Sequence, residues 1–204
     1  MKDIAIQTRI YVRNRISTLA SFEGDSAVRA QLAHLRRGIS KKPGSQPELW
    51  EITLLQIPES MMSKDGDPTY AEWAVHTALT LFALHQQGKD IKSQNMHLDG
   101  RRLGLAVGEL VGPDGDDTRI KRRFDSAATA NSIEEISYHL RGLIQLMKDK
   151  EVKLDYASLA EDLFWYQFPG RRDSVRLSWG RDFYRQLYMN TEKKNKNAKG
   201  DVGK

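Results

Sequence analysis

The stretch SIEEISYHLRGLIQLMK, residues 132–148, has the pattern of an amphipathic α-helix. Ser132 and Glu135 have the spacing of a capping box, in which each side chain bonds the other residue's backbone N–H at a helix start. After this start, apolar side chains recur every three or four positions, at Ile133, Ile136, Leu140, Ile144 and Met147. On a helix they form one stripe about 100° wide, the width of a face that packs on a core. The stretch therefore predicts a core-facing helix.

The same periodicity recurs along most of the chain. Clear helical patterns occupy residues 70–84, 103–110, 119–127, 155–166 and 175–187, and weaker ones occupy roughly 4–20, 26–37 and 47–57. Gly112-Pro113 and Pro169-Gly170 mark helix ends. The sequence contains no alternating strand of convincing length and no β-hairpin turn between β-rich runs. We therefore expect an all-α protein of about eight or nine helices in two helical-bundle units.

Three short signals predict where individual helices begin. Asp67 followed by Pro68 has the pattern of an N-cap and a first-turn proline, and Thr69 with Glu72 offers a capping box one turn later. Asp155 can cap the helix that follows it.

The segment Gly112–Asp117 is the best candidate linker, because it combines glycines, a proline and aspartates. It divides the chain into an N-terminal helical unit, residues 1–112, and a C-terminal helical bundle, residues 113–190. Residues 191–204 are rich in lysine and asparagine, so we expect a disordered basic tail there.

Composition excludes several classes of protein. Hydrophobic residues make up 39% and charged residues 29% of the 204 residues, as in a soluble globular protein. No apolar run approaches the roughly 20 residues that span a bilayer, and the start lacks the features of a secretory signal. Cysteine is absent, which excludes disulfides and cysteine metal sites and fits a cytoplasmic protein.

Basic residues are concentrated in a few segments, on a chain of net charge +5. The densest is Arg119-Ile120-Lys121-Arg122-Arg123-Phe124, in which Ile120 and Phe124 share one helix face while three arginines lie beside it. Residues 29–42 hold five basic side chains and no acid, and Arg141 and Lys148 share a flank of the helix over 133–148. Arginine presents a planar fork of donors that suits phosphate, so these segments predict a surface that binds polyanions.

Catalytic and cofactor motifs are missing from the sequence. The five histidines include no pair three or four apart, so no local helical metal site is present. There is no phosphate-binding glycine-lysine loop, dinucleotide fingerprint or Gly-x-Ser-x-Gly turn. We therefore expect no enzyme activity and no cofactor. Simpler interpretations are that the arginines form a solvated surface and that Trp73, Trp179 and Phe183 pack in the core rather than stack on bases.

A series of short elements occurs in order over residues 26–188. They are Arg36-Arg37-Gly38, Leu81–Gln86, Leu103-Gly104, Arg122-Arg123-Phe124, His139–Ile144, Leu154-Asp155-Tyr156, Leu159–Leu163, Trp179 and Phe183-Tyr184. With these elements the chain resembles the CasB family, the small subunit of the type I-E CRISPR surveillance complex Cascade. The segment after Asn190 lies outside the family pattern.

The resemblance implies a scaffold without catalytic activity, folded as helical bundles in two parts. Two copies would line the complex beside the guide RNA and help to hold the DNA strand that is displaced when the guide pairs with its target. The expected partners are guide RNA and target DNA, the other Cascade subunits and a second copy, in a prokaryotic cytoplasm and without a membrane.

Position within the family pattern also predicts the residues that bind the nucleic-acid backbone. They are Arg36, Arg37, Arg101, Arg102, Arg119, Arg122, Arg123 and Arg141. Some of these could instead contact neighbouring protein subunits. The alternative function is a helical adaptor whose arginine clusters bind acidic surfaces of partner proteins.

Overall fold

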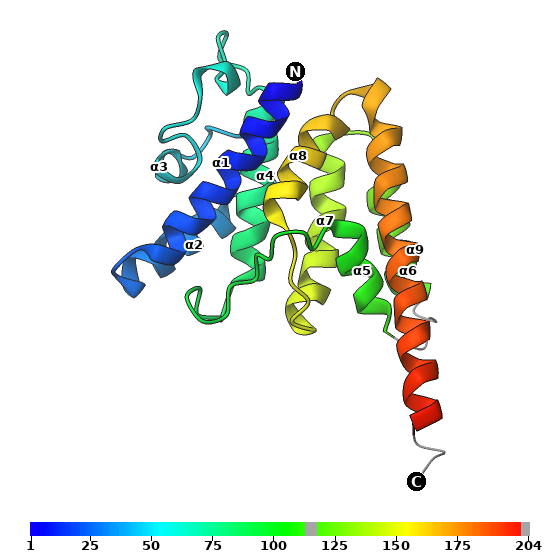
Figure 1. Ribbon diagram of the computed structural model, residues 1–204. Coiled ribbons are helices and arrows are strands. Elements are labelled where there is room, and N and C mark those ends of the chain that lie inside the picture. Colours follow the sequence, from blue (N-terminus) through cyan, green and yellow to red (C-terminus); the bar gives the residue numbers. More distant parts are fainter. Residues whose placement is uncertain (113–117, 201–204) are drawn as a thin grey trace.

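The computed structural model describes residues 1–112 and 118–200, with residues 193–200 described by their backbone only. These ranges form nine α-helices and no strand, which confirms the all-α prediction (Figure 1). The helices are α1 (Lys2–Ser21), α2 (Asp25–Arg37), α3 (Trp50–Thr53), α4 (Tyr70–His85), α5 (Leu103–Val111), α6 (Thr118–Thr129), α7 (Ile133–Asp149), α8 (Tyr156–Tyr166) and α9 (Pro169–Gly200). Two 3₁₀ turns, η1 (Pro47–Leu49) and η2 (Glu59–Met61), lie between α2 and α4.

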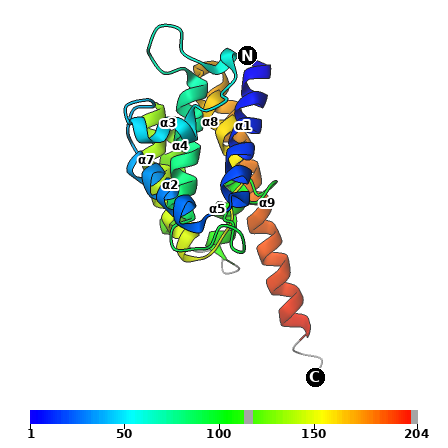
Figure 2. The same ribbon diagram turned by 90° about the vertical axis from the view of Figure 1, so that its left-hand side faces the viewer.

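Helix α4 lies at the centre of the fold and packs against α1, α2, α7 and α8 (Figures 1 and 2). Every residue from 74 to 86 is buried, including Thr77 and Thr80. A helix that is buried on all sides needs no polar face, which is why this segment is mostly apolar and carries no charged lysine, arginine, aspartate or glutamate.

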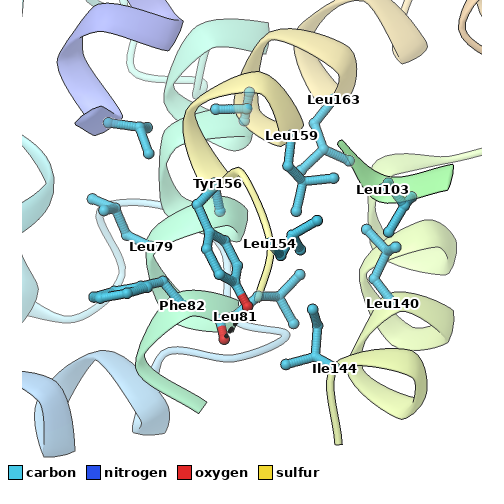
Figure 3. Close-up of a cluster of buried hydrophobic side chains, with 14 of the residues drawn as sticks. Leu79, Leu81, Phe82, Leu103, Leu140, Ile144, Leu154, Tyr156, Leu159 and Leu163 are labelled. Carbon is cyan, nitrogen blue, oxygen red and sulfur yellow. Dashed lines mark hydrogen bonds between the residues drawn. The ribbon is translucent and has the colours of Figure 1, made fainter. Parts of the chain in front are cut away.

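The core around α4 is built from several helices (Figure 3). Leu79 and Phe82 of α4 face Tyr156 at the start of α8, while Leu140 of α7 and Leu103 of α5 close the far side. The Tyr156 hydroxyl lies 2.9 Å from Nδ1 of His85 and 3.4 Å from the Leu81 carbonyl oxygen, so this buried hydroxyl has hydrogen-bond partners.

Helix starts follow the capping signals in the sequence. Ser132 and Asp155 each accept a hydrogen bond from the backbone N–H three residues on, at Glu135 and Ser158, as predicted. The reciprocal half of the capping box predicted at Ser132 is wrong, because the Glu135 carboxylate accepts from the Asn131 backbone N–H at 2.7 Å. For α4, Thr69 forms the capping box with Glu72, and the alternative start at Asp67 is wrong. Asp67 instead pairs with Lys42 at 2.8 Å.

Helix α9 is the longest element and packs closely against α5. Trp179 and Phe183 are buried on its inner face, as predicted. The helix continues to residue 200, where the sequence predicted a disordered tail from residue 191, and its far end extends beyond the other helices (Figure 1). Lysine, glutamate and alanine in this stretch are good helix formers and no proline interrupts them, so the helix propagates.

The predicted boundary between two helical units falls between α5 and α6, next to residues 113–117, which lie outside the described ranges. The division into two units stays a prediction. None of the helices described is both long enough and apolar enough to cross a lipid bilayer.

Candidate nucleic-acid interface

Helix α6 presents the arginine-rich segment as its sequence predicts. Ile120, Phe124 and Ala127 are buried, and the Phe124 ring lies 5.1 Å from that of Phe183 on α9, centroid to centroid. Because this stripe fixes the helix on the core, the basic residues of its other faces are exposed, including Arg119, Arg122 and Arg123.

Helices α6 and α7 enclose a basic hollow of about 270 Å³, which we call the α6–α7 hollow. Its lining includes Arg123 and Ser126 of α6 with Tyr138, Arg141 and Gln145 of α7. A second hollow of about 320 Å³ shares Arg123 and Gln145 with it and extends to Lys148. The structure thus brings together two arginines that are far apart in the sequence.

Three arginines of helices α6 and α7 are available to a ligand. Arg122, Arg123 and Arg141 form no ion pair with a carboxylate in the described part of the chain. No acidic side chain from the described ranges lines the α6–α7 hollow, and the extension toward Lys148 includes one, Asp149. The hollow therefore has an uncompensated positive charge that suits an anion.

Two residues shape this hollow without carrying charge. Gly142 leaves room for Arg123, because a β-carbon at this position would lie 2.9 Å from Arg123 Nη1. Tyr138 is 69% exposed and offers an aromatic face beside Arg141, on which a base can stack. Sequence reasoning missed Tyr138, although its place off the apolar stripe and three residues before Arg141 is a signal for it.

Four of the predicted residues lie elsewhere. Arg37 is exposed at the end of α2, and Arg36 lines a separate hollow beside that helix. Arg101 pairs with Glu109 and donates a hydrogen bond to Gln186 at 3.4 Å. Arg102 donates to Asp162 at 3.0 Å, so both of the latter arginines have partners within the fold.

Arginines of α9 that contribute to the basic character of the sequence also have structural contacts. Arg176 donates to the Ala130 carbonyl at 3.0 Å, and Arg172 donates to the Tyr166 carbonyl at 3.0 Å. These bonds tie the start of α9 to α8 and to the end of α6. Such side chains stabilise the fold, and a count of arginines in the sequence overstates the basic surface.

Within the described ranges, His97, Asp99 and Asp155 form the one group with the composition of a metal site. The Tyr156 backbone N–H donates to His97 Nδ1 at 3.1 Å, so the proton of the neutral ring is on Nε2, which then has no lone pair for a metal. Asp155 accepts hydrogen bonds from Gly100 and Ser158, and Asp99 pairs with Arg13. These bonds give the group a structural role.

Comparison with known proteins assigns the chain to a family. The model of the family described as CRISPR-associated protein Cse2 matches residues 31–184. The chain belongs to the Cse2 family. This is the CasB family of type I-E Cascade small subunits, so the recognition made from spaced sequence elements is confirmed. The matched range contains α6, α7 and the hollow between them.

Solved structures of Cse2-family proteins share the fold. CasB from Thermobifida fusca is 30% identical over 88% of this chain and 97% of its own, with a TM-score of 0.70. CasB from M. ruber is 20% identical over 88% of this chain and 95% of its own, with a TM-score of 0.65, which shows similarity of fold. A search of curated protein sequences gave no match.

Proposed function

We propose that this Cse2-family chain is a non-catalytic subunit of Cascade that binds nucleic-acid backbones without reading base sequence. In this role it stabilises the guide RNA, the target DNA and the displaced strand during antiviral defence. It acts in the cytoplasm, and two copies are present in each complex. The observation that carries the proposal is the α6–α7 hollow, in which Arg123 and Arg141 meet with no counter-charge from the described residues.

The chemistry of the hollow suits a phosphate backbone. Guanidinium groups bind phosphate oxygens in a bidentate manner, and Lys148 continues the positive charge beyond the hollow. Contacts of this type position a strand without specifying its sequence. In RNA-guided complexes base pairing reads the sequence, which leaves shape and charge to the protein.

The remaining predicted residues have different places in this proposal. Arg119 and Arg122 are exposed on the same helix as Arg123 and extend the basic surface along α6. Arg36, Arg37, Arg101 and Arg102 stay predictions as nucleic-acid ligands, since they lie outside the α6–α7 hollow.

The test is the salt dependence of binding by an R123A/R141A variant. Fluorescence anisotropy with labelled single-stranded DNA, single-stranded RNA and duplex DNA gives the slope of log K against log salt. We expect the slope to flatten by about 0.7 per lost phosphate contact on a single strand and about 0.9 on a duplex. A K2A/K64A variant, which also removes two exposed cations, should keep the wild-type slope.

Unchanged slope and affinity in R123A/R141A would exclude this hollow as the binding surface. If the wild-type protein binds none of the three nucleic acids at low salt but still binds the other Cascade subunits, the adaptor function is the better description.

A further inference from the structure

A separate hollow, of about 360 Å³, lies between α2 and the turn over residues 86–91, and we call it the α2 hollow. Arg29 and Arg36 line it from α2. Val28 and Leu32 of the same helix, with Ile91 of the turn, give it an apolar floor, and each of these three is less than 7% exposed.

The guanidinium groups of Arg29 and Arg36 form no hydrogen bond or ion pair with another residue of the described ranges. In contrast, Asp25 pairs with Lys92 at 3.1 Å and Lys89 pairs with Glu151. Arg36 is partly buried, and burial, with a smaller effect of neighbouring Arg37, lowers the pKa of its guanidinium. A partly desolvated cation without a counter-charge favours an anionic ligand.

The α2 hollow differs from the α6–α7 hollow in the kind of anion that it suits. Asp25 and Asp90 also line it, so the hollow favours a ligand with separate negative charges placed at the two arginines over a continuous polyanion such as a phosphate backbone. The apolar floor provides a contact that a phosphate group cannot use. The two features together favour a peptide that carries carboxylates beside an apolar side chain.

The spacing of the arginines defines this peptide further. Arg29 and Arg36 are seven residues apart on α2, which separates them by about 10 Å along the helix axis. Two carboxylates at i and i+7 of a partner helix have the same separation and lie on one face of that helix.

We propose that the α2 hollow is a docking site for another protein subunit of Cascade, which inserts an acidic segment with two carboxylates about 10 Å apart and an apolar side chain between them. Arg29 and Arg36 bind the carboxylates, and the floor formed by Val28, Leu32 and Ile91 receives the apolar side chain. This site assigns Arg36 to a protein contact, the alternative that the sequence left open.

The first test is charge reversal in the reconstituted complex. An R29E/R36E variant is expressed with the other Cascade subunits of the same organism, and its incorporation is measured by native mass spectrometry. We expect at least about a tenfold loss of incorporation, because reversal leaves both partner carboxylates facing like charge. A K2E/K64E variant has the same change in net charge at exposed positions outside both hollows and should assemble normally.

The second test identifies the contact directly. An R29K/R36K variant keeps the charge and supplies primary amines, which a carbodiimide couples to carboxylates in direct contact. Mass spectrometry of the assembled complex should show cross-links from position 29 or 36 to an aspartate or glutamate beside an apolar residue of another subunit. This variant also keeps the proposal testable if charge reversal impairs folding.

Three outcomes would overturn the proposal. They are full incorporation of R29E/R36E, the lack of any cross-link from positions 29 and 36 to a partner carboxylate, and cross-links that lead only to a second copy of this chain. Nucleic-acid binding by isolated R29E/R36E distinguishes the two proposals, since we expect it to match that of the K2E/K64E control. A larger loss of nucleic-acid affinity than in that control, with normal assembly, would assign the hollow to a strand instead.

Discussion

At the scale of single residues, Arg102 was predicted from the sequence to bind nucleic acid, and in the structure it pairs with Asp162 inside the fold. The Asp162 side chain is 10% exposed and accepts hydrogen bonds from Arg102 at 3.0 Å and from the Trp179 indole at 2.7 Å. Burial raises the pKa of Asp162 to about 6, and the Arg102 guanidinium opposes that rise. Above this pH, Asp162 is a buried anion that depends on Arg102.

We therefore expect R102A to destabilise the protein by about 2–3 kcal/mol at pH 7.5, somewhat below the cost of breaking a fully buried pair because Arg102 is partly exposed. The loss should be smaller at pH 5.5, since Asp162 then takes up a proton and no longer needs a counter-charge. Urea unfolding at the two pH values measures the difference.

A double-mutant cycle provides the control for this pair. In a D162N background, R102A should cost less than in the wild type, because the anion is already gone. Equal costs in both backgrounds would show that Arg102 does not act through Asp162.

At the scale of elements, the contact between α5 and α9 depends on two glycines one turn apart. A β-carbon on Gly104 would overlap the Trp179 carbonyl oxygen and approach Asp182 Cβ to 2.8 Å, and one on Gly108 would approach Gln186 Cβ to 2.7 Å. The backbones of the two helices can therefore meet only without side chains at these positions. We expect G104A to destabilise the protein by about 3 kcal/mol, measured as a lower Tm.

Gly180 of α9 offers a matched control for this prediction. A β-carbon there would have no neighbour within 4 Å, so G180A should stabilise the protein by about 0.5–1 kcal/mol through helix propensity alone. If G104A melts at the wild-type temperature, or if both variants shift Tm in the same direction, close packing of α5 on α9 does not explain why position 104 is a glycine.

The elements also show which features a sequence can predict. The apolar stripes of α6 and α7 and the caps at Ser132 and Asp155 follow from residues within one or two helical turns, so local pattern predicts them. The pairing of Arg102 with Asp162 joins positions 60 residues apart, and no local pattern encodes it. The same holds for the hollow between Arg123 and Arg141, for which only the charge of each segment could be predicted.

At the scale of the whole molecule, the buried histidines couple the stability of the core to pH. His85 is the last residue of α4, and its ring contacts the Tyr156 hydroxyl. Burial lowers the pKa of His85 to about 4, with a smaller effect from Lys89 and Lys148. Burial also lowers the pKa of His76 and of His97. Each of these rings is neutral in the folded core, whereas in the unfolded chain it takes up a proton near its ordinary pKa of 6.5.

The direction in which stability changes with pH follows from these pKa shifts. The contribution of His85 to the free energy of unfolding is complete above pH 6.5 and is lost as the pH falls toward 4, by about 3 kcal/mol in total. Asp162 acts in the opposite direction below pH 6, because its raised pKa lets the folded state take up a proton first. We expect the three histidines to outweigh it, so that the protein loses stability between pH 6.5 and 4.5.

Denaturant unfolding at several pH values, for the wild type and for H85Q, measures how much of this loss of stability is due to His85. Glutamine retains a hydrogen-bonding group for the Tyr156 hydroxyl but does not titrate, so H85Q should be less stable than the wild type at pH 7.5 and lose less stability on acidification. The difference in the free energy of unfolding between the wild type and H85Q should therefore become smaller as the pH falls. Parallel stability curves would mean that His85 does not contribute to the acid sensitivity.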